Sequence, residues 1–179
     1  YSGLKIHEIL DLELAGMGQY AHGNQPIQHA IYLYNYAQQP WKTQEKVRYV
    51  MDNLYGEGAD GYCGDEDNGQ TSAWFVFSSL GFYPVAPVTG QYILGSPLFK
   101  EVEINLNNGK ILRINAKNNS ENNIFIDSFK FNQLESNKNW IDHKDLRNGG
   151  VIDFEMSNNP NLDWGSAMNS VPFAMTKIK

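Results

Sequence analysis

The chain has 179 residues, of which 41% are hydrophobic, so it is long enough to bury one good-sized core or two small ones. A formal net charge of −6 and a pI near 5.1 exclude an electrostatic nucleic-acid binder, because no run of Lys or Arg supplies a basic surface. No apolar stretch approaches the roughly 20 residues that a membrane span needs. The chain opens on Tyr1, not Met, and we expect it to be a piece of a longer polypeptide.

The first half of the chain has helical spacing. Pro26 suits a first helical turn, and residues 27–37 carry apolar or tyrosyl side chains on nearly every face, which predicts a buried helix. Pro40-Trp41 separates it from an amphipathic helix over 43–55, whose apolar residues recur at i, i+3, i+4 and i+7. The almost wholly apolar segment 72–85 predicts an interior helix that stops at Gly81 and Pro84.

Two polar clusters precede apolar helices. Residues 64–69 (GDEDNG, the acidic loop) place the consecutive carboxylates Asp65, Glu66 and Asp67 between glycines. Crowded carboxylates are typical of general acid/base pairs or hard-cation sites, although an acidic turn that caps the next helix explains the same residues. The sequence leaves both interpretations open.

Residues 23–29 (GNQPIQH, the amide loop) form the second cluster, and we expect the two loops to face one cleft. Asn24, Gln25, Gln28 and His29 offer carbonyl oxygens and neutral donors, which suit hydroxyl recognition or a hard cation. The alternative is that Asn24 caps a helix and the others are solvated. For His29, a packed, hydrogen-bonded role is about as well supported as a role in a site.

The remaining chemistry-bearing residues favour structural roles. Cys63 is the only cysteine, which excludes an internal disulfide framework and a cysteine-based zinc site, and we interpret it as a packing residue. The histidines outside the amide loop are interpreted as structural or surface residues: His7, His22 and His143.

From residue 85 onward the pattern changes to short runs with a period of two. These runs predict strands over 92–94, 102–106, 111–116, 123–131 and 151–156. Asn107-Asn108-Gly109 between two of them is the strongest hairpin signal in the chain. The sequence therefore predicts an α+β protein, with helices first and a mostly antiparallel β segment after them.

Short motifs follow one another in a single register along almost the whole chain. They are GNQPIQH with YLYNY (23–36), PWKTQ (40–44), GDEDNGQTSAW (64–74), LGFYPV (80–85), GSPLF (95–99), WIDH (140–143) and NLDWG (161–165). In this order they closely resemble glycoside hydrolase family 92. The resemblance implies calcium-dependent exo-acting α-mannosidases that act on mannose-containing glycans and that are typically secreted or periplasmic in bacteria.

The resemblance also implies a two-domain parent, with an N-terminal β-sandwich and an (α/α)6-type catalytic domain. Residues 1–87 would then be the last helices of the toroid, and residues 88–179 a β-rich C-terminal segment. We expect this chain to pack against the missing N-terminal part of the parent.

The family's inverting mechanism pairs a general acid with a carboxylate that activates water. By resemblance Asp65 and Asp67 are the candidates for this base, with Asp67 preferred. An inverting enzyme separates its two carboxyl groups by roughly 6.5–9.5 Å, so neighbours in sequence do not supply both. We expect the general acid upstream of this chain, which leaves the isolated fragment incomplete and inactive.

The resemblance further assigns Ca²⁺ to the site, where it binds sugar hydroxyls, with Gln28 and Glu66 as the expected ligands. Asn24, Gln25 and His29 are the expected substrate-binding residues. Relatives often carry a carboxylate at the position of Gln25, and those selective for α-1,2 links tend to have His at that of Asn24. These departures argue against α-1,2 specificity and lower the repulsion of an anionic leaving group, so a mannosyl phosphodiester is a candidate substrate.

Two other hypotheses remain. The chain is a non-catalytic carbohydrate-binding or structural module, or it belongs to a catalytically inactive family member. A pure binding module has no need of three adjacent carboxylates at the start of a buried helix, although it could use them to hold calcium.

Overall fold

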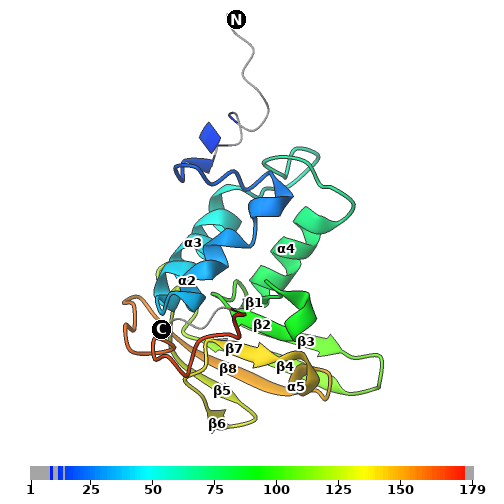
Figure 1. Cartoon of the computed structure of the whole chain (residues 1–179). Helices are drawn as coiled ribbons and strands as arrows, with labels where there is room; N and C mark the ends of the chain where they lie inside the picture. Colours follow the sequence, from blue (N-terminus) through cyan, green and yellow to red (C-terminus); the bar gives the residue numbers. More distant parts are fainter. Residues whose placement is uncertain (1–8, 10–11, 14, 176–179) are drawn as a thin grey trace, which may run out of the picture.

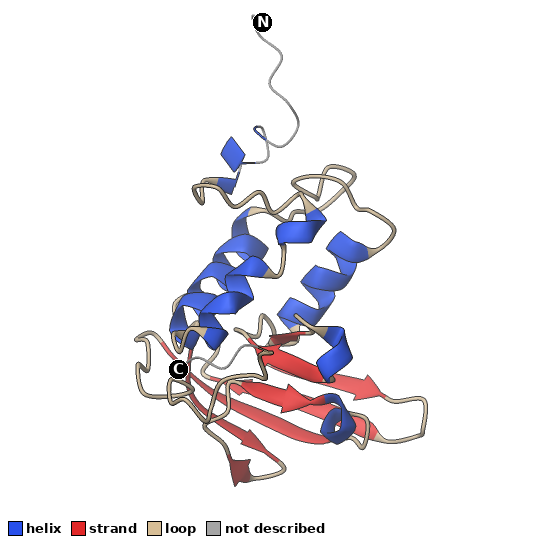
Figure 2. Ribbon diagram, viewed as in Figure 1, coloured by secondary structure: helices blue, strands red, loops and turns tan. Residues whose placement is uncertain are grey.

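The computed structural model describes residues 9, 12–13 and 15–175 (Figure 1). Most helices gather at one end of the molecule, and the strands lie at the other end together with the short helix α5 (His143–Leu146), as Figure 2 shows. We call residues 15–81 the helical half and residues 82–175 the sheet half. The α+β class predicted from the sequence, with helices preceding strands, is confirmed.

The helical half begins with short elements. The segment predicted as one helix over 27–37 is instead broken into two single 3₁₀ turns and one α-helical turn, so that prediction was wrong. The pieces are η1 (Gln25–Ile27), η2 (Ala30–Tyr32) and α2 (Leu33–Tyr36). Pro26 lies in the first turn as expected, and Tyr32 is fully buried, whereas Leu33 is 44% exposed.

Two longer helices complete this half. Helix α3 (Pro40–Asn53) begins at Pro40, a favoured first position, and buries the predicted apolar stripe of Val47, Val50, Met51 and the adjoining Leu54. Helix α4 (Gln70–Ser79) follows the acidic loop and buries Trp74 completely. Its burial is one-sided, however, because Val76 is 55% exposed. The expectation of a wholly interior helix therefore does not hold within this chain.

The sheet half contains two sheets. One has the strand order β1-β2-β7 and is antiparallel, and the other has the order β3-β4-β8-β5-β6. The strands are β1 (Phe82–Tyr83), β2 (Gln91–Leu94), β3 (Glu101–Asn105), β4 (Ile111–Lys117), β5 (Phe125–Phe131), β6 (Leu134–Glu135), β7 (Trp140–Asp142) and β8 (Gly150–Ser157). Two short helices lie between them, η3 (Pro87–Thr89) and α5 (His143–Leu146).

The predicted strands and hairpin are confirmed in the larger sheet. Strands β3 and β4 pair antiparallel across residues 107–109, and Gly109 takes a left-handed φ of 78° in the turn. The sheet is mostly antiparallel as predicted, but β8 lies between β4 and β5 and runs parallel to β4. Alternate residues of β4, such as Leu112 and Ile114, are buried in the core, as period-two patterning requires.

The three-stranded sheet separates two hydrophobic cores. Phe82 and Leu94 pack in the core of the sheet half, whereas their neighbours Tyr83 and Ile93 pack in the core of the helical half. Adjacent strand residues point to opposite faces, so this small sheet serves both cores. The predicted boundary between residues 87 and 88 thus lies next to a small sheet that contributes to both cores. The division into two domains stays a prediction.

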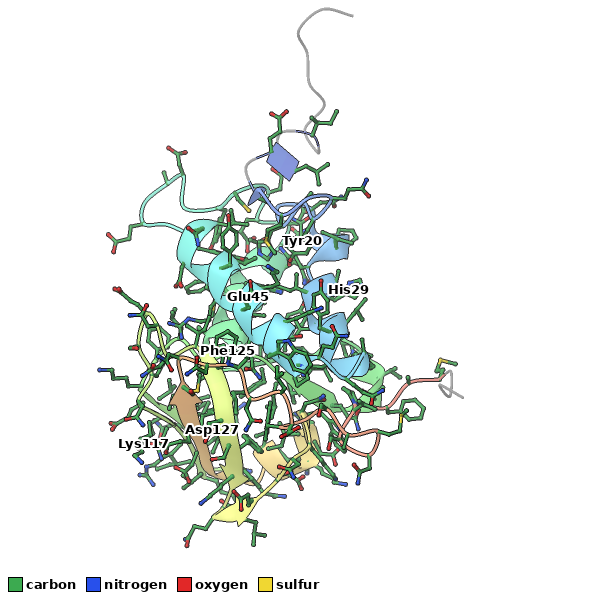
Figure 3. The ribbon with its side chains drawn as sticks, turned by 90° about the vertical axis from the view of Figure 1, so that its left-hand side faces the viewer. Tyr20, His29, Glu45, Lys117, Phe125 and Asp127 are labelled. Atoms are coloured by element: carbon green, nitrogen blue, oxygen red, sulfur yellow. The ribbon has the colours of Figure 1, made fainter. Side chains whose placement is uncertain are left out.

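Buried polar side chains tie the halves together. Asn35 of α2 donates to the carbonyls of Leu94 and Asn139, and Asn139 donates back to the carbonyls of Asn35 and Gly165. Three of these bonds join Asn35 to the sheet half and hold the helices against the small sheet, and the fourth, to Gly165, lies within the sheet half. Figure 3 shows the resulting arrangement, with Tyr20 and His29 among the helices and Lys117 and Asp127 on the far sheet.

Candidate active site

The two polar loops touch at a pair of glycines. A Cβ atom added to Gly64 would lie 2.5 Å from the Cα of Gly23 and 2.8 Å from its carbonyl oxygen. No side chain fits at that distance, so the backbones of the amide loop and the acidic loop are in direct contact. Gly23 and Gly64, the first residues of the two loops, therefore allow the two clusters to lie side by side.

A cavity of about 610 Å³ opens beside this contact, between the amide loop, the acidic loop and the segment after β1. It is lined by Gln25, Pro26, His29, Asp67, Asn68, Gln70, Tyr83, Pro84, Val85 and Pro87. The expectation that both loops face one cleft is therefore confirmed. Its lining mixes polar side chains with prolines and one tyrosine, which is suited to a polar ligand with apolar faces.

Asp67 is the carboxylate that faces the cavity. Its φ of 49°, followed by 57° at Asn68 and 94° at Gly69, makes a left-handed run that few non-glycine residues adopt. Among the described residues, the Asp67 carboxylate has no hydrogen-bond or ion-pair partner. Such a group is available to accept a proton from a water or a hydroxyl in the cavity.

Asp65 is held by its backbone. Its carbonyl oxygen accepts hydrogen bonds from Gln25 Nε2 at 2.6 Å and from Thr71 Oγ1 at 2.8 Å. Its carboxylate is exposed and, within the described part of the chain, has no partner. Asp65 does not belong to the cavity lining, so of the two base candidates Asp67 has the better position.

Glu66 caps helix α4. Its carboxylate accepts bonds from the Ser72 hydroxyl at 2.7 Å and from the Gly69 amide at 2.6 Å, with a longer bond from the Ser72 amide at 3.4 Å. The Ser72 hydroxyl, followed by the Gly69 amide, lowers the pKa of the Glu66 carboxyl. The capping interpretation of the acidic loop is thus correct for Glu66, and not for its two neighbours.

Thr71 is the centre of the hydrogen bonds beneath the site. It is fully buried, and its hydroxyl donates to the Asp65 carbonyl while it accepts from Gln25 Nε2 at 3.4 Å and from Gln28 Nε2 at 3.3 Å. One hydroxyl therefore fixes the acidic loop and two side chains of the amide loop. The sequence predicts no role for Thr71, which directly precedes the helix expected over 72–85 and is the second residue of α4.

Gln28 lies behind the cavity wall. It is fully buried, its Nε2 also donates to the His22 carbonyl at 3.1 Å, and its Oε1 accepts a long bond of 3.5 Å from Gln70. Gln70 lines the cavity and donates to the Tyr83 hydroxyl at 2.9 Å. The side-chain oxygen Oε1 of Gln28 is consequently separated from the cavity only by Gln70, and it accepts no hydrogen bond but this long one among the described residues.

A buried chain of neutral groups supports Thr71 from below. The Tyr55 hydroxyl donates to the Thr71 carbonyl at 3.2 Å, so it accepts from His22 Nε2 at 2.8 Å, which places the ring proton on Nε2. His22 Nδ1 then accepts from the Tyr20 hydroxyl at 2.6 Å. Burial lowers the pKa of His22 to about 3, so the ring is neutral around pH 7.

The predicted structural role of His22 is consistent with this chain, and His143 is exposed on the sheet half, where its Nδ1 lies 3.2 Å from the Tyr92 hydroxyl. His7 lies outside the described residues. Cys63 packs at the edge of the helical core, as expected.

The predicted substrate-binding residues take different positions. Gln25 and His29 line the cavity, and the His29 ring has no hydrogen-bond partner among the described residues. Asn24 is exposed, is outside the cavity lining and makes no side-chain cap of η1, so the capping alternative for this residue was wrong. Gln70 and Tyr83 line the cavity without having been predicted, although both stand inside the quoted motifs.

The part of the chain that the structure describes has no group of three or more His, Cys, Asp or Glu residues placed to hold a metal ion. Side-chain oxygens in the cavity lining come from Gln25, Asp67, Asn68 and Gln70, while Gln28 lies behind Gln70 and Glu66 binds the Gly69 amide within the acidic loop. Oxygen-only donors suit a hard cation such as Ca²⁺, but Glu66 already accepts from the backbone of α4.

Comparison with known proteins decides the family. The sequence profile of the glycosyl hydrolase family 92 catalytic domain matches residues 6–158. The chain belongs to glycoside hydrolase family 92. The match runs through all eight strands and the helices from η1 to α5, so the family resemblance read from the motifs is confirmed, and the chain is part of the catalytic region of a glycoside hydrolase.

Solved structures of family 92 members have the same fold. An inverting mannosidase from Bacteroides thetaiotaomicron VPI-5482 is 49% identical, with a TM-score of 0.84 over 97% of this chain and 24% of its own. An α-mannosidase of the family from Bacteroides thetaiotaomicron is 37% identical, with a TM-score of 0.87 over 90% of this chain and 22% of its own.

A curated relative from Arthroderma benhamiae, described as an uncharacterized secreted glycosidase, is 28% identical over 154 residues, which are 84% of this chain and 20% of that protein. The chain thus spans about a quarter or less of the length of these relatives. No helix in the described residues is both long and apolar enough to cross a membrane.

Proposed function

We propose that this chain supplies the general-base side of an inverting exo-α-mannosidase site that removes terminal mannose from glycans. The observation that carries the proposal is the unpartnered Asp67 carboxylate in the cavity between the two loops. Membership of family 92, and an inverting mannosidase that is 49% identical, support the reaction class. The relative that is described as secreted supports a secreted or periplasmic enzyme.

In this mechanism Asp67 removes a proton from the water that attacks the anomeric carbon, and the leaving-group oxygen takes its proton from an acid outside this chain. The left-handed backbone at Asp67 and the bonds to the Asp65 carbonyl keep the loop in one conformation. Gln25 and His29, which line the same cavity, bind the sugar hydroxyls. Asn24 lies outside the lining, and its role in substrate binding stays a prediction.

Calcium is part of the proposal. Gln28 Oε1 is the best-placed ligand, because its amide nitrogen is fixed by two bonds and its oxygen is only weakly engaged. Glu66 is the second, through the lone pairs that its helix-capping bonds leave free. A bound Ca²⁺ supplies Lewis-acid polarisation and orientation of sugar hydroxyls, and the remaining ligands come from substrate, water or the rest of the parent.

The substrate proposal extends to mannosyl phosphodiesters. Gln25 Nε2 donates to the Asp65 carbonyl at 2.6 Å, a contact in which a carboxylate oxygen would face another acceptor. The neutral amide therefore suits the loop and leaves the cavity rim less negative than a carboxylate would. An anionic leaving group is repelled less strongly as a result.

The test is mannose release from aryl and disaccharide α-mannosides by the full-length parent and by this chain, each with calcium and with a chelator. Activity in the parent alone, lost with chelator and restored by calcium, is the expected result. An inactive parent would favour the binding-module or inactive-member hypothesis. Efficient cleavage of α-1,2-mannobiose, with no preference for phosphodiesters, would contradict the substrate proposal only.

A further inference from the structure

Two neighbouring polar side chains in the cavity take no part in the proposed mechanism, Gln70 and Tyr83. Gln70 is the first residue of α4, and Tyr83 is the last residue of β1. Gln70 Nε2 lies 2.9 Å from the Tyr83 hydroxyl. Because a side-chain amide and a hydroxyl can each donate and accept, the direction of this hydrogen bond decides what the two residues offer to a ligand.

A backbone carbonyl fixes that direction. The carbonyl oxygen of His22 can only accept, so the Gln28 side chain directs its Nε2 toward it, at 3.1 Å. The Thr71 hydroxyl, which donates to a backbone carbonyl, accepts from the same nitrogen. Gln28 Oε1 then faces Gln70 at 3.5 Å, and an oxygen at that place requires the nitrogen of the Gln70 amide opposite it. Gln70 Nε2 is therefore the donor to the Tyr83 hydroxyl.

Tyr83 is left with a hydrogen to donate. Its hydroxyl accepts from Gln70, and among the described residues it has no acceptor for its own hydrogen. Burial raises the pKa of Tyr83, so the phenol keeps this hydrogen at neutral pH. Gln70 Oε1, in turn, accepts no hydrogen bond within the described part of the chain. The two residues thus present one donor and one acceptor to the cavity, which are the two partners that a hydroxyl group needs.

The Tyr83 ring is fixed by its surroundings. Only 8% of the residue is exposed, and it pairs with Ile93 in the three-stranded sheet. Its ring stacks on that of Tyr32, with the ring centroids 5.3 Å apart. Tyr32 is itself fully buried, and its hydroxyl donates to Ser78 at 2.8 Å. A donor on a ring that is already immobile loses little conformational freedom on binding, so Tyr83 is preorganised for a ligand.

We propose that Tyr83 is a substrate-binding residue that donates a hydrogen bond to one hydroxyl group of the mannose ring, and that Gln70 orients the Tyr83 hydroxyl. This inference rests on the proposed function, because it places a sugar in the cavity with Asp67. The Asp67 carboxylate only accepts hydrogen bonds, and Tyr83 supplies a donor to the same cavity. A sugar that lacks the contacted hydroxyl leaves a largely buried donor without a partner, so Tyr83 discriminates among sugars.

The experiment measures kcat/KM of the full-length parent and of its Tyr83→Phe variant on an aryl α-mannoside and on derivatives that each lack one sugar hydroxyl. Tyr83→Phe removes the donor and keeps the stacked ring. We expect the discrimination against one derivative to be about tenfold weaker in Tyr83→Phe than in the parent, and the discrimination against the others to be unchanged. A purely structural role of Tyr83 would instead lower kcat/KM on all derivatives by the same factor.

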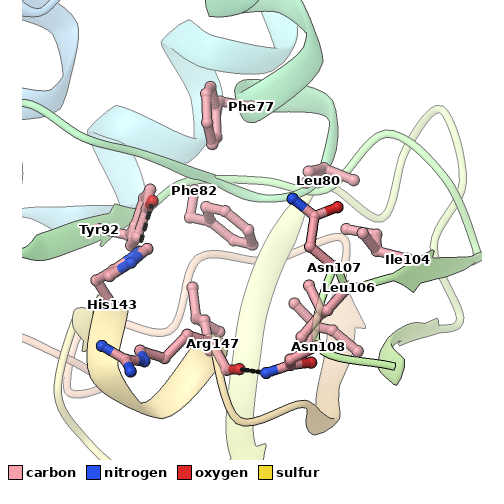
Figure 4. A pocket seen from close by; sticks show the side chains of 12 residues that line it. Phe77, Leu80, Phe82, Tyr92, Ile104, Leu106, Asn107, Asn108, His143 and Arg147 are labelled. Carbon is pink, nitrogen blue, oxygen red and sulfur yellow. Dashed lines mark hydrogen bonds between the residues drawn. The ribbon is translucent and has the colours of Figure 1, made fainter. Parts of the chain in front are cut away.

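Tyr92→Phe is the matched control, because it removes the same group outside the cavity. The Tyr92 hydroxyl lies 3.2 Å from His143 Nδ1 at a separate groove of about 330 Å³ between the end of α4 and α5, as Figure 4 shows. We expect this variant to discriminate among the derivatives as the parent does.

Gln70→Glu tests the orienting role. A carboxylate at position 70 only accepts, so the Tyr83 hydroxyl would donate to it and no longer to the sugar. We expect Gln70→Glu to lose the same discrimination as Tyr83→Phe, and the double variant to lose no more of it than either single variant. Additive losses in the double variant would overturn the orienting role of Gln70.

The outcomes separate this inference from the proposed function. An active parent whose Tyr83→Phe variant keeps the parent's selectivity, or loses kcat/KM equally on every derivative, would overturn the role of Tyr83 and leave the mannosidase proposal standing. A parent that hydrolyses no α-mannoside would overturn both.

Discussion

The two halves of the molecule use their residues in different ways. In the sheet half, Leu112, Ile114 and Phe154 turn inward and polar neighbours turn outward. In the helical half, Thr71 and His22 are fully buried while Val76 is exposed. The sheet half therefore depends mainly on apolar packing, whereas the helical half buries polar groups that position a site.

We expect the largest effect on kcat, from substituting an aspartate in the helical half and not from the same substitution in the sheet half. Asp67→Asn in the parent should lower kcat by about 10³-fold, because a positioned general base contributes roughly 10²–10⁴-fold. Asp127→Asn, an exposed aspartate of the sheet half, should leave kcat unchanged. Steady-state kinetics on an α-mannoside, with melting temperatures as a control for folding, measure both.

The same assay decides between the two base candidates. Asp65→Asn should have a smaller effect than Asp67→Asn, since the loop holds Asp65 through its carbonyl and leaves its carboxylate outside the cavity. A larger loss for Asp65→Asn would assign the base to Asp65.

We expect acid to lower the free energy of unfolding through His22, a buried residue of the helical half. Burial lowers the pKa of His22 to about 3 from its ordinary 6.5, so below pH 6.5 the unfolded chain binds a proton that the folded chain refuses. The stability that the neutral ring contributes is full above pH 6.5 and is lost, at about 1.4 kcal/mol per pH unit, as the pH falls toward 3.

Denaturant unfolding of the parent between pH 7 and 5 measures this slope. His22→Gln should be less stable at pH 7 and should show a flatter pH dependence, since the titrating ring is gone. His143→Gln, which changes an exposed histidine of the sheet half, should keep the slope of the unaltered protein. Equal slopes in all three proteins would show that His22 is not kept neutral by the fold.

Two variants, one in each core, compare the loss of a buried hydroxyl with the loss of a buried methyl group. Thr71→Val keeps the shape of a fully buried side chain but leaves the Asp65 carbonyl and two glutamine amides short of a partner, which should cost about 2 kcal/mol. Ile114→Val in the other core should cost about 1 kcal/mol.

Activity distinguishes the two variants more clearly than stability does. Thr71→Val should also lower kcat/KM by at least about tenfold, because the acidic loop loses its anchor. Thr71→Ser should restore most of it, and Ile114→Val should leave it unchanged. An active Thr71→Val enzyme would show that the loop is held by the Gln25 bond and the glycine contact alone.

The sequence predicted the sheet half better than the helical half for a physical reason. Period-two patterning and the turn at Gly109 are local signals, and they located the hairpin and five of the eight strands, namely β2, β3, β4, β5 and β8. These signals missed the short strands β1, β6 and β7, and they also missed the parallel pairing of β8 with β4, which joins distant segments. The broken helix over residues 25–36 had an apolar pattern that did not distinguish 3₁₀ turns from α-helix.

The sequence motifs predicted which residues line the site, but not the contacts that hold them in place. Asp67, Gln25 and His29 line one cavity as the loops suggested, and family membership follows from the same residues. The roles of Thr71 and Glu66 within the loop depend on hydrogen bonds across the fold, and the contact of Gly23 with Gly64 depends on tertiary packing. No local pattern encodes those contacts.

The smallest expected effect concerns Gln25, where the loops meet. Gln25→Glu places a carboxylate oxygen where Nε2 now donates to the Asp65 carbonyl at 2.6 Å, so the loop should move and the parent should lose about 1 kcal/mol of stability. The added charge should lower kcat/KM for a mannosyl phosphodiester about fivefold relative to a neutral mannoside, through repulsion of the phosphate.

Gln133→Glu is the matched control for this last change. It adds the same charge at an exposed residue of the sheet half, so long-range electrostatics alone would alter both variants alike. A preference between substrates that changes only in Gln25→Glu assigns leaving-group discrimination to the amide loop. Equal losses on both substrates would limit Gln25 to holding the acidic loop in place, and the neutral amide would then reflect the contact with Asp65 and not the substrate.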